Sequence, residues 1–293
     1  MHRFSSLSFV PKHEPPTVHD VRLLQSFLNS KSQTLVLTGA GVSTESGIPD
    51  YRSEGVGLYA RSTRRPTTIQ QFVSSRYAQK SYWARNFFGW PRFAALHPNV
   101  AHSTIRNWEY SNKISGLVTQ NVDGLHQKAG SKDVIELHGT GHLVICMSCD
   151  YSISRHLFQN ILLDLNCHLD VQPNLEDVRP DGDIDLIQEA VDKFNLPFCP
   201  KCSTGALKPY IVFFGDNVPK DRVDKISDVL KRSDSLLVLG SSLETFSSYR
   251  YILAANQLEL PIGIISLGPT RADALCSFKI KSRVGEILPL IKL

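Results

Sequence analysis

Apolar residues recur along this chain with two spacings, which predict alternating helices and strands. Residues 18–29 carry apolar side chains at three- and four-residue intervals, the spacing of an amphipathic helix, and helical patterns also cover 219–231 and 246–257. Short apolar runs that are typical of buried strands occupy 34–38, 114–118, 133–137, 210–214, 235–239 and 262–266. Because helical segments separate several of these runs, the sequence predicts an α/β fold with a parallel sheet.

The region after the first strand run has a weaker pattern. Residues 54–95 are rich in aromatic residues and arginine. We expect helices at 69–75 and 80–88, with the second ending before Pro91, because proline disrupts the interior of a helix. His97-Pro98-Asn99 then favours the start of a further helix.

The alternation stops between residues 140 and 208, and a Cys-x-x-Cys pair stands near each end of this interval. Two such turns can place four thiolates around one metal ion, and the paired spacing favours zinc. Four thiolates leave no position open for water or substrate, so we predict one structural zinc held by Cys146, Cys149, Cys199 and Cys202. Cys167 and Cys276 are interpreted as non-ligands.

The interval between the two cysteine pairs is long and acidic. Residues 164–192 contain nine Asp or Glu residues and one arginine. A charge run of this kind is ordinarily a solvated surface loop, and that is the default interpretation. A long loop in a compact enzyme can also be a lid, and this alternative stays open.

Composition and charge narrow the class of protein. The chain has 293 residues, 42% of them apolar, with a formal net charge of +4. This charge is too small to favour nucleic-acid binding, and no apolar stretch approaches the length of a membrane span. Residues 1–16 have one Arg, several Ser and no acid before Glu14, so we expect a disordered tail or the remnant of a targeting segment.

A glycine-rich stretch follows the first strand run. Gly39 and Gly41 flank Ala40, as in a loop that holds phosphate groups. A dinucleotide fingerprint has a third glycine three residues further on, where this chain has Thr44. The stretch therefore favours a dinucleotide site and leaves open whether the chemistry is hydride transfer.

Polar residues follow the ends of other predicted strands. Gln120, Asn121 and Asp123 come directly after one strand run, and His138 follows the next. The carboxyl ends of parallel strands form one edge, where ligands bind in open α/β sheets. Asn and Gln suit an amide ligand, Asp suits ribose hydroxyls, and His is a general base near neutral pH. The structural alternative is a turn that caps a helix at 124–129 and a histidine that serves only packing.

Two later segments fit the same edge, and a third has two interpretations. Gly240-Ser241-Ser242 and Ser266-Leu267-Gly268 each follow a strand run and carry small residues that suit a ribose or a phosphate. Residues 212–216 form an apolar strand that ends in Gly215 and Asp216. This strand is either plain core or an edge to which an extended peptide can add a strand.

Together these motifs resemble those of the sirtuin family. GAGVSTESGIPDYRS, TQNVDGLH, ELHG, the two cysteine pairs, FFGD and GSSLE stand in the family's order over about residues 18–293. GLYARSTRRP and the long inter-cysteine loop most resemble the class II, mitochondrial branch. The resemblance implies a Rossmann-type parallel sheet with helices on both faces (17–139 and 209–293) and a small inserted zinc-ribbon module (140–208).

The resemblance also implies NAD as a co-substrate, with His138 as the catalytic base and Asn121 beside it. The residues expected to contact NAD are Gly39, Ala40, Gly41, Thr44, Asp50, Tyr51, Arg52, Gln120, Asn121, Asp123, Gly240, Ser241, Ser242, Ser266, Leu267, Gly268 and Val284. Those expected to contact the substrate are Tyr59, Val212, Phe213, Phe214 and Gly215.

The implied activity is removal of acyl groups from lysine, with release of nicotinamide and transfer of the acyl group to ADP-ribose. Relatives that remove short dicarboxylic acyl groups carry a Tyr and an Arg where this chain has Asn86 and Gly89. This difference argues against short dicarboxylic groups. Since the long acidic loop can shape the acyl entrance, we expect bulky groups, such as lipoyl or branched acyl chains, in preference to acetyl. The partners would be acyl-lysine proteins or peptides, without nucleic acid or membrane, and the protein would be a monomer in the mitochondrial matrix.

Three alternatives stay open at this point. Protein mono-ADP-ribosylation would use the same site. A dehydrogenase with a structural zinc would need the third fingerprint glycine, which is absent. A non-enzymatic NAD sensor or zinc-ribbon binding module is disfavoured by a base-like histidine at the predicted nicotinamide edge.

Overall fold

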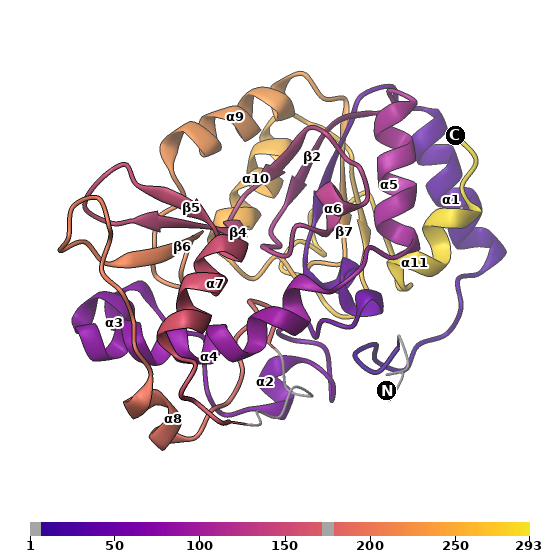
Figure 1. Cartoon of the computed structure of the whole chain (residues 1–293). Helices are drawn as coiled ribbons and strands as arrows, with labels where there is room; N and C mark the ends of the chain where they lie inside the picture. Colours follow the sequence, from indigo (N-terminus) through magenta and orange to yellow (C-terminus); the bar gives the residue numbers. More distant parts are fainter. Residues whose placement is uncertain (1–6, 172–178) are drawn as a thin grey trace.

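The computed structural model describes residues 7–171 and 179–293, and two sheets form its framework (Figure 1). The larger sheet has six parallel strands in the order β3 (Val134–Glu136), β2 (Ile114–Thr119), β1 (Thr34–Thr38), β7 (Ser235–Leu239), β8 (Ile262–Ile265) and β9 (Phe278–Ile280). The smaller sheet is antiparallel, in the order β5 (Ser152–Ser154), β4 (Gly139–Cys146) and β6 (Leu207–Ile211).

Helices cover both faces of the parallel sheet, which explains the continuous apolar runs of its strands. On β1, Val36 packs into a core with the helices α1 (Val18–Asn29), α5 (Val100–Tyr110) and α11 (Val284–Ile287). Leu35 and Leu37 point the other way, into a core with α9 (Lys220–Lys231) and α10 (Phe246–Gln257). The predicted α/β class is confirmed, as are the helices at 18–29, 219–231 and 246–257 to within one residue.

The strand register brings the carboxyl ends of three central strands level with one another. Thr38 at the end of β1 pairs with Thr119 of β2 on one side and with Leu239 of β7 on the other. The residues that follow these strands therefore meet at one edge, and we call this edge the rim.

A second group of helices packs on the small sheet. These are α3 (Ile69–Ser74), α4 (Arg76–Ala94), α7 (Arg155–Leu165) and α8 (Gln188–Lys193). Side chains of all four helices form one core with Val144 of β4, Leu207 of β6 and the four paired cysteines, while Trp90 and Phe93 of α4 join a smaller cluster. Residues 69–94 thus pack with the small sheet, although the predicted division of the chain places them with the parallel one, and that division stays a prediction.

Two expectations about individual helices and strands are wrong. The apolar run 210–214 is not a strand of the parallel sheet: Leu207–Ile211 forms β6 of the small sheet, and beyond it Phe214 makes only an isolated bridge to Thr68. Helix α4 does not end before Pro91. Proline leaves the carbonyl four residues earlier without its helical donor, and here Gln159 Nε2 donates to Phe87 O at 3.0 Å, which satisfies that carbonyl.

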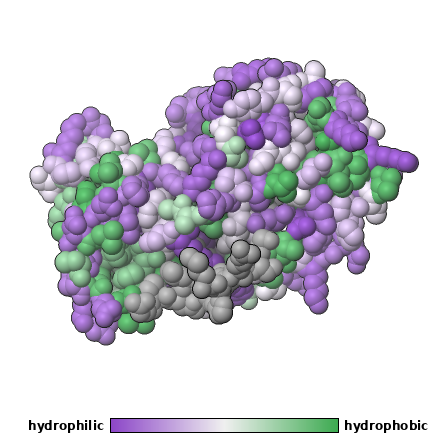
Figure 2. Space-filling model, turned by 45° about the vertical axis from the view of Figure 1, so that its right-hand side comes forward, coloured by the Kyte–Doolittle hydropathy of each residue, from purple (hydrophilic) through white to green (hydrophobic). Residues whose placement is uncertain are grey.

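The remaining elements are short. They are α2 (Leu58–Arg61), α6 (Leu125–Lys128) and the 3-10 turns Ala40–Val42, Thr44–Ser46 and Leu288–Leu290. Within 7–171 and 179–293, no helix combines the length and the hydrophobicity needed to cross a bilayer. Figure 2 shows hydrophobic residues toward both ends of one face, among hydrophilic ones. Phe9, in the predicted tail, is 7% exposed and packs against the molecule.

Candidate functional site

A cavity of about 900 Å³ lies at the rim of the parallel sheet. Its volume is at the upper end of the range for small-molecule sites. Predicted site residues on its wall are Ala40, Gly41, Thr44, Asp50, Tyr51, Arg52, Gln120, Asn121, Asp123, His138, Val212, Phe213, Phe214, Gly215, Gly240, Ser241, Ser242, Ser266, Leu267, Gly268 and Val284. The structure thus brings together residues that are far apart in the sequence.

The glycine stretch lies against the segment that follows β7. A Cβ built on Gly39 would lie 2.6 Å from Ser241 Cβ, and one on Gly41 would lie 2.8 Å from Gly240 O. Both distances are too short for a real side chain, so the two backbone segments can approach only because these residues are glycines. Gly39 itself is not among the residues that line the cavity.

The polar residues after β2 hold the rim together. Asn121 Nδ2 donates to Gly39 O and to Ser43 Oγ, both at 3.1 Å. Ser43 Oγ in turn donates to Asp123 Oδ2 at 2.7 Å. Leu125 N donates to Asp123 Oδ1, so the predicted helix-capping turn is also present. Burial raises the pKa of Asp123, while these hydrogen bonds act in the opposite direction.

His138 stands at the end of β3 with a defined arrangement of its ring. Its Nδ1 donates to Gln120 O at 2.9 Å, so the neutral ring has its lone pair on Nε2. That Nε2 accepts from Ser247 Oγ at 2.8 Å. Burial lowers the pKa of His138 to about 4, partly opposed by the bond to Gln120. The imidazole is therefore neutral at neutral pH and able to accept a proton at Nε2.

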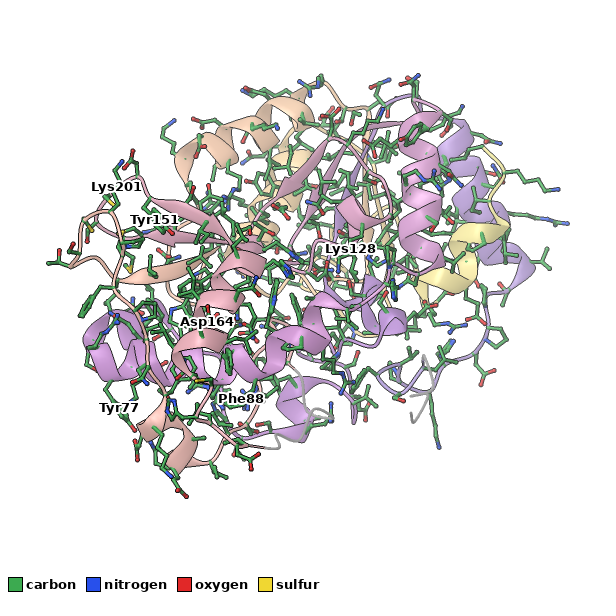
Figure 3. The ribbon with its side chains drawn as sticks, in the orientation of Figure 1. Tyr77, Phe88, Lys128, Tyr151, Asp164 and Lys201 are labelled. Atoms are coloured by element: carbon green, nitrogen blue, oxygen red, sulfur yellow. The ribbon has the colours of Figure 1, made fainter. Side chains whose placement is uncertain are left out.

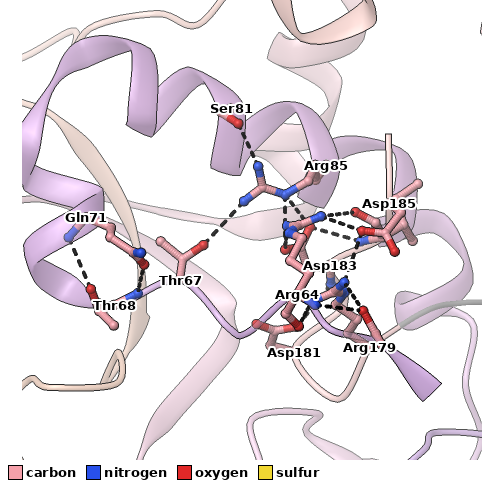
Figure 4. A network of polar contacts seen from close by, with 12 residues as sticks. Arg64, Thr67, Thr68, Gln71, Ser81, Arg85, Arg179, Asp181, Asp183 and Asp185 are labelled. Carbon is pink, nitrogen blue, oxygen red and sulfur yellow. Dashed lines mark hydrogen bonds and ion pairs between the residues drawn. The ribbon is translucent and has the colours of Figure 1, made fainter. Parts of the chain in front are cut away.

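Part of the long acidic segment enters the cavity. Residues 179–185, which we call the docked loop, place Pro180 and Asp181 on the wall. Arg64 Nη2 lies 2.6 Å from Asp183 Oδ2, and Arg85 Nε lies 3.1 Å from Asp183 Oδ1 (Figure 4). The Asp183 side chain is 2% exposed. The default expectation of a solvated surface loop is therefore wrong for residues 179–184, because arginines of the aromatic-rich region neutralise Asp183, whereas Asp185 is exposed as expected. Residues 172–178 lie outside the described part.

Burial and neighbouring charge change the ionisation of Asp181. Burial raises the pKa of Asp181 to about 6, and the negative charge of Asp183 adds to this shift. Asp183 N donates to Asp181 Oδ1 at 3.2 Å. The docked loop thus contributes a carboxyl group to the cavity wall whose charge changes near neutral pH.

Asn86 and Gly89 each have a structural role in helix α4. Arg155, which is fully buried, donates to Asn86 Oδ1 at 3.1 and 2.9 Å through Nε and Nη2. A Cβ on Gly89 would lie 2.2 Å from Gly182 O, so any larger residue there would displace the docked loop. Tyr59, a predicted substrate residue, is not on the wall; its ring packs 5.9 Å from that of Tyr51.

The four cysteines of the two pairs form a separate cluster at the end of the small sheet, near the labelled residues Tyr151 and Lys201 (Figure 3). Their Sγ atoms lie within 4.8 Å of one another, and the pairs Cys146–Cys202 and Cys149–Cys199 are 3.7 and 3.6 Å apart. A tetrahedral zinc with Zn–S bonds of about 2.3 Å needs S···S separations of about 3.8 Å. The cluster therefore fits one zinc with four thiolates and no open position.

Comparisons with known proteins agree with this geometry. The family model described as the Sir2 family matches residues 39–247. The chain belongs to the Sir2 family, the sirtuins. It is 52% identical over 96% of its length to "NAD-dependent protein deacylase Sirt4" of Drosophila melanogaster, and covers 89% of that protein. It is 49% identical over 97% of its length to human "NAD-dependent protein lipoamidase sirtuin-4, mitochondrial", again covering 89%.

Solved sirtuin structures show the same fold. A complex described as "Sir2-p53 peptide-NAD+" matches with a TM-score of 0.69 and 28% identity, over 92% of this chain and 95% of the other. One described as "Sir2 bound to acetylated peptide" matches with a TM-score of 0.70 and 27% identity, over 92% and 95%. The predicted fold class, a parallel sheet with a small zinc module, is confirmed.

Sequence reasoning missed several residues of this sirtuin's cavity. Ser247 donates a hydrogen bond to His138, and Ser43 donates one to Asp123. Asp181 of the docked loop lies on the cavity wall. Ser43 stands within the glycine motif and could have been found there. Ser247 and Asp181 carry no local signal, because only the tertiary arrangement brings them to the cavity.

Proposed function

We propose that this chain is an NAD-consuming protein-lysine deacylase that releases nicotinamide and transfers the acyl group to ADP-ribose. The observation that carries the proposal is His138, which lines a cavity walled by the glycine stretch and the polar rim and whose lone pair is on Nε2. The relatives named as NAD-dependent deacylase and lipoamidase support the same activity.

NAD supplies the electrophile, because loss of nicotinamide leaves a ribose carbon that an acyl-lysine oxygen can attack. Gly39–Gly41, with Thr44, Asp50, Tyr51 and Arg52, would surround the phosphates and the adjoining ribose. Gln120, Asn121 and Asp123 would face the nicotinamide, and the adenosine half would lie against Gly240–Ser242, Ser266–Gly268 and Val284. Backbone N–H groups and small residues suit an anionic diphosphate, which supports this placement.

His138 would take a proton from a ribose hydroxyl at Nε2. Its Nδ1–H is held by Gln120 O, which fixes the tautomer that this role needs. Because its pKa is lowered to about 4, nearly all of the enzyme carries the base in its active form at neutral pH. Ser247 now occupies Nε2 and would have to yield that position to the substrate hydroxyl.

The acyl-lysine would enter along Val212–Gly215, whose residues line the cavity beside the docked loop. We propose bulky acyl groups, such as lipoyl or branched chains, as preferred substrates. The lipoamidase names of relatives support this preference, as does the absence of the dicarboxylate-binding Tyr and Arg at Asn86 and Gly89. The structural zinc would only hold the small sheet. We propose that the protein is a monomer that acts on acyl-lysine proteins in the mitochondrial matrix; relatives named mitochondrial support the organelle.

The test is a panel of acyl-lysine peptides incubated with NAD and followed by mass spectrometry. We expect nicotinamide release coupled to deacylation, with lipoyl- or branched-acyl peptides turned over faster than acetyl peptides. His138→Ala should lower the rate by about 10²–10⁴-fold while the zinc-to-protein ratio stays at one. Absence of turnover for every peptide contradicts the deacylase, and mass gain of the protein by ADP-ribose would support the transferase alternative instead.

A further inference from the structure

The segment before α1 reaches the wall of the cavity. Val10, Pro11 and Lys12 are lining residues, together with the glycine stretch and residues 282–284. Lys12 is also an exposed residue, so it borders both the cavity and solvent. No motif in the sequence assigns a role to this segment, and the expected site residues do not include it.

Both ends of this lining stretch are anchored. On one side, Phe9 is 7% exposed, and the guanidinium of Arg61 in α2 lies 5.0 Å from its ring centroid. On the other side, His13 Nε2 lies 2.9 Å from Glu286 Oε2 in α11. The three lining residues therefore run between α2 and α11, two elements that are far apart in the sequence.

The α11 anchor is itself tied to the glycine stretch. Arg283 lies 3.6 Å from Glu286 Oε2 and 3.6 Å from Glu45 Oε2. Glu45 Oε1 accepts from Gly285 N at 3.0 Å. Glu45 stands in the turn Thr44–Ser46, directly after the glycines. A single polar chain thus joins the N-terminal segment to the proposed diphosphate loop.

We infer that Phe9–His13 forms a strap that closes over NAD, and that Lys12 places a positive charge near the diphosphate. This inference rests on NAD occupying the cavity as proposed above. A cation at the wall attracts the anionic diphosphate, and a chain segment across the cavity slows the escape of the bound nucleotide. The strap would act on NAD binding and leave the acyl chemistry at His138 unchanged.

The first experiment compares KM values in the full-length enzyme. Lys12→Ala should raise KM for NAD about threefold and Lys12→Glu about tenfold, with both effects shrinking at high salt. Lys12→Arg should keep the wild-type value. KM for the acyl peptide and kcat should stay within about twofold, because the substitution acts on NAD binding and not on the proton transfer at His138. Lys31→Ala, which removes a lysine outside this cavity, is the matched control.

The second experiment detects the strap directly. Trypsin can cut after Lys12, and ADP-ribose should slow this cleavage because a strap closed over nucleotide is less open to protease. His13→Ala and Glu286→Gln should both weaken the protection by releasing one anchor. Titration of ADP-ribose by calorimetry needs no turnover, so it tests the strap even if no acyl peptide is deacylated.

Two results would overturn the strap. One is a KM for NAD that stays within twofold in Lys12→Glu while Lys31→Ala behaves the same way. The other is cleavage after Lys12 that proceeds equally fast with and without saturating ADP-ribose. A wild-type enzyme that binds ADP-ribose with strap protection but deacylates no peptide would contradict the proposed function and leave the strap standing.

Discussion

The rim and the docked loop both line one cavity, but different interactions hold them in place. At the rim, backbone packs directly on backbone: Gly41 leaves no space for a Cβ beside Gly240. In the docked loop, charged side chains fix the position, with Arg64 and Arg85 both bonded to Asp183. The rim follows from strand register, whereas the loop depends on a few ion pairs.

This difference suggests a division of roles. A surface made of backbone and small residues has one shape, which suits a ligand of constant structure such as NAD. A loop held by side chains can change by substitution without disturbing the sheet, and it stands where the acyl group would lie. We therefore expect changes at the rim to act on NAD binding and on every substrate, and changes in the docked loop to act on the acyl preference.

The largest expected effect is at the rim. In Gly41→Ala the new methyl group would lie 2.8 Å from Gly240 O, so the two segments must move apart. A shift of this size beside the reacting groups should lower kcat/KM about 100-fold with all acyl peptides. Gly268→Ala is the control for stability, since nothing lies within 4 Å of its built Cβ. Equal unfolding free energies and activities of the two variants would contradict the packing argument.

The same contrast explains which parts of the fold and of the site could be predicted from the sequence. Strand runs and helical spacing are local, so β1, β2 and β7 and the polar residues after them were predictable. The position of the docked loop was not predictable. It depends on Gly89, where a Cβ would not fit, and on Arg85 and Arg64, which are 98 and 119 residues from Asp183 in the sequence. Likewise, an apolar run does not say which sheet it joins, and Pro91 is tolerated only because Gln159 reaches Phe87 O.

Acid should weaken the rim. His126 is 1% exposed beside Thr38, with its ring 4.8 Å from that of His102. Burial lowers the pKa of His126 from 6.5 to about 4, so the unfolded chain binds a proton in a range where the folded chain does not. The free energy of unfolding therefore has its full value above pH 6.5. It falls toward pH 4, by about 2–3 kcal/mol for this group. Urea unfolding between pH 4 and 7 should show this loss, and His126→Gln should remove the share of this histidine while His138, whose pKa is also lowered to about 4, keeps its own.

Removing the central charge of the docked loop should lower the free energy of unfolding by less than acid does through His126. Asp183→Asn leaves Arg64 and Arg85 without their carboxylate, but Arg64 stays 31% exposed and can be hydrated. We expect a loss of about 2 kcal/mol in unfolding free energy. The ratio of lipoyl to acetyl turnover should change, with KM for NAD unaltered.

The matched control is Asp185→Asn in the same loop. Asp185 bonds Arg64 and also Arg179, whose side chain is 2% exposed, but Asp185 itself is 58% exposed. Because water reaches it and the amide oxygen in Asp185→Asn can still accept from both guanidinium groups, we expect a loss of about 1 kcal/mol. If Asp183→Asn raised KM for NAD and left the ratio of lipoyl to acetyl turnover unchanged, the proposed division of roles would be contradicted.

The smallest expected effect is the pH response of Asp181, and its sign is opposite to that of His126. Burial raises the pKa of Asp181 from 3.8 to about 6, so the folded chain holds a proton that the unfolded chain has released. Its ionisation therefore costs stability above pH 6, and this cost disappears as the pH falls toward 3.8. Because the side chain lines the cavity and is partly hydrated, we expect this cost to be only about 1 kcal/mol.

Asp181→Asn should therefore be more stable than the wild type at pH 8 and equal to it at pH 4 in urea unfolding. A variant less stable at pH 8 would show that the ionised carboxylate holds the loop in place, and the contrast between rim and loop would then lie in geometry alone.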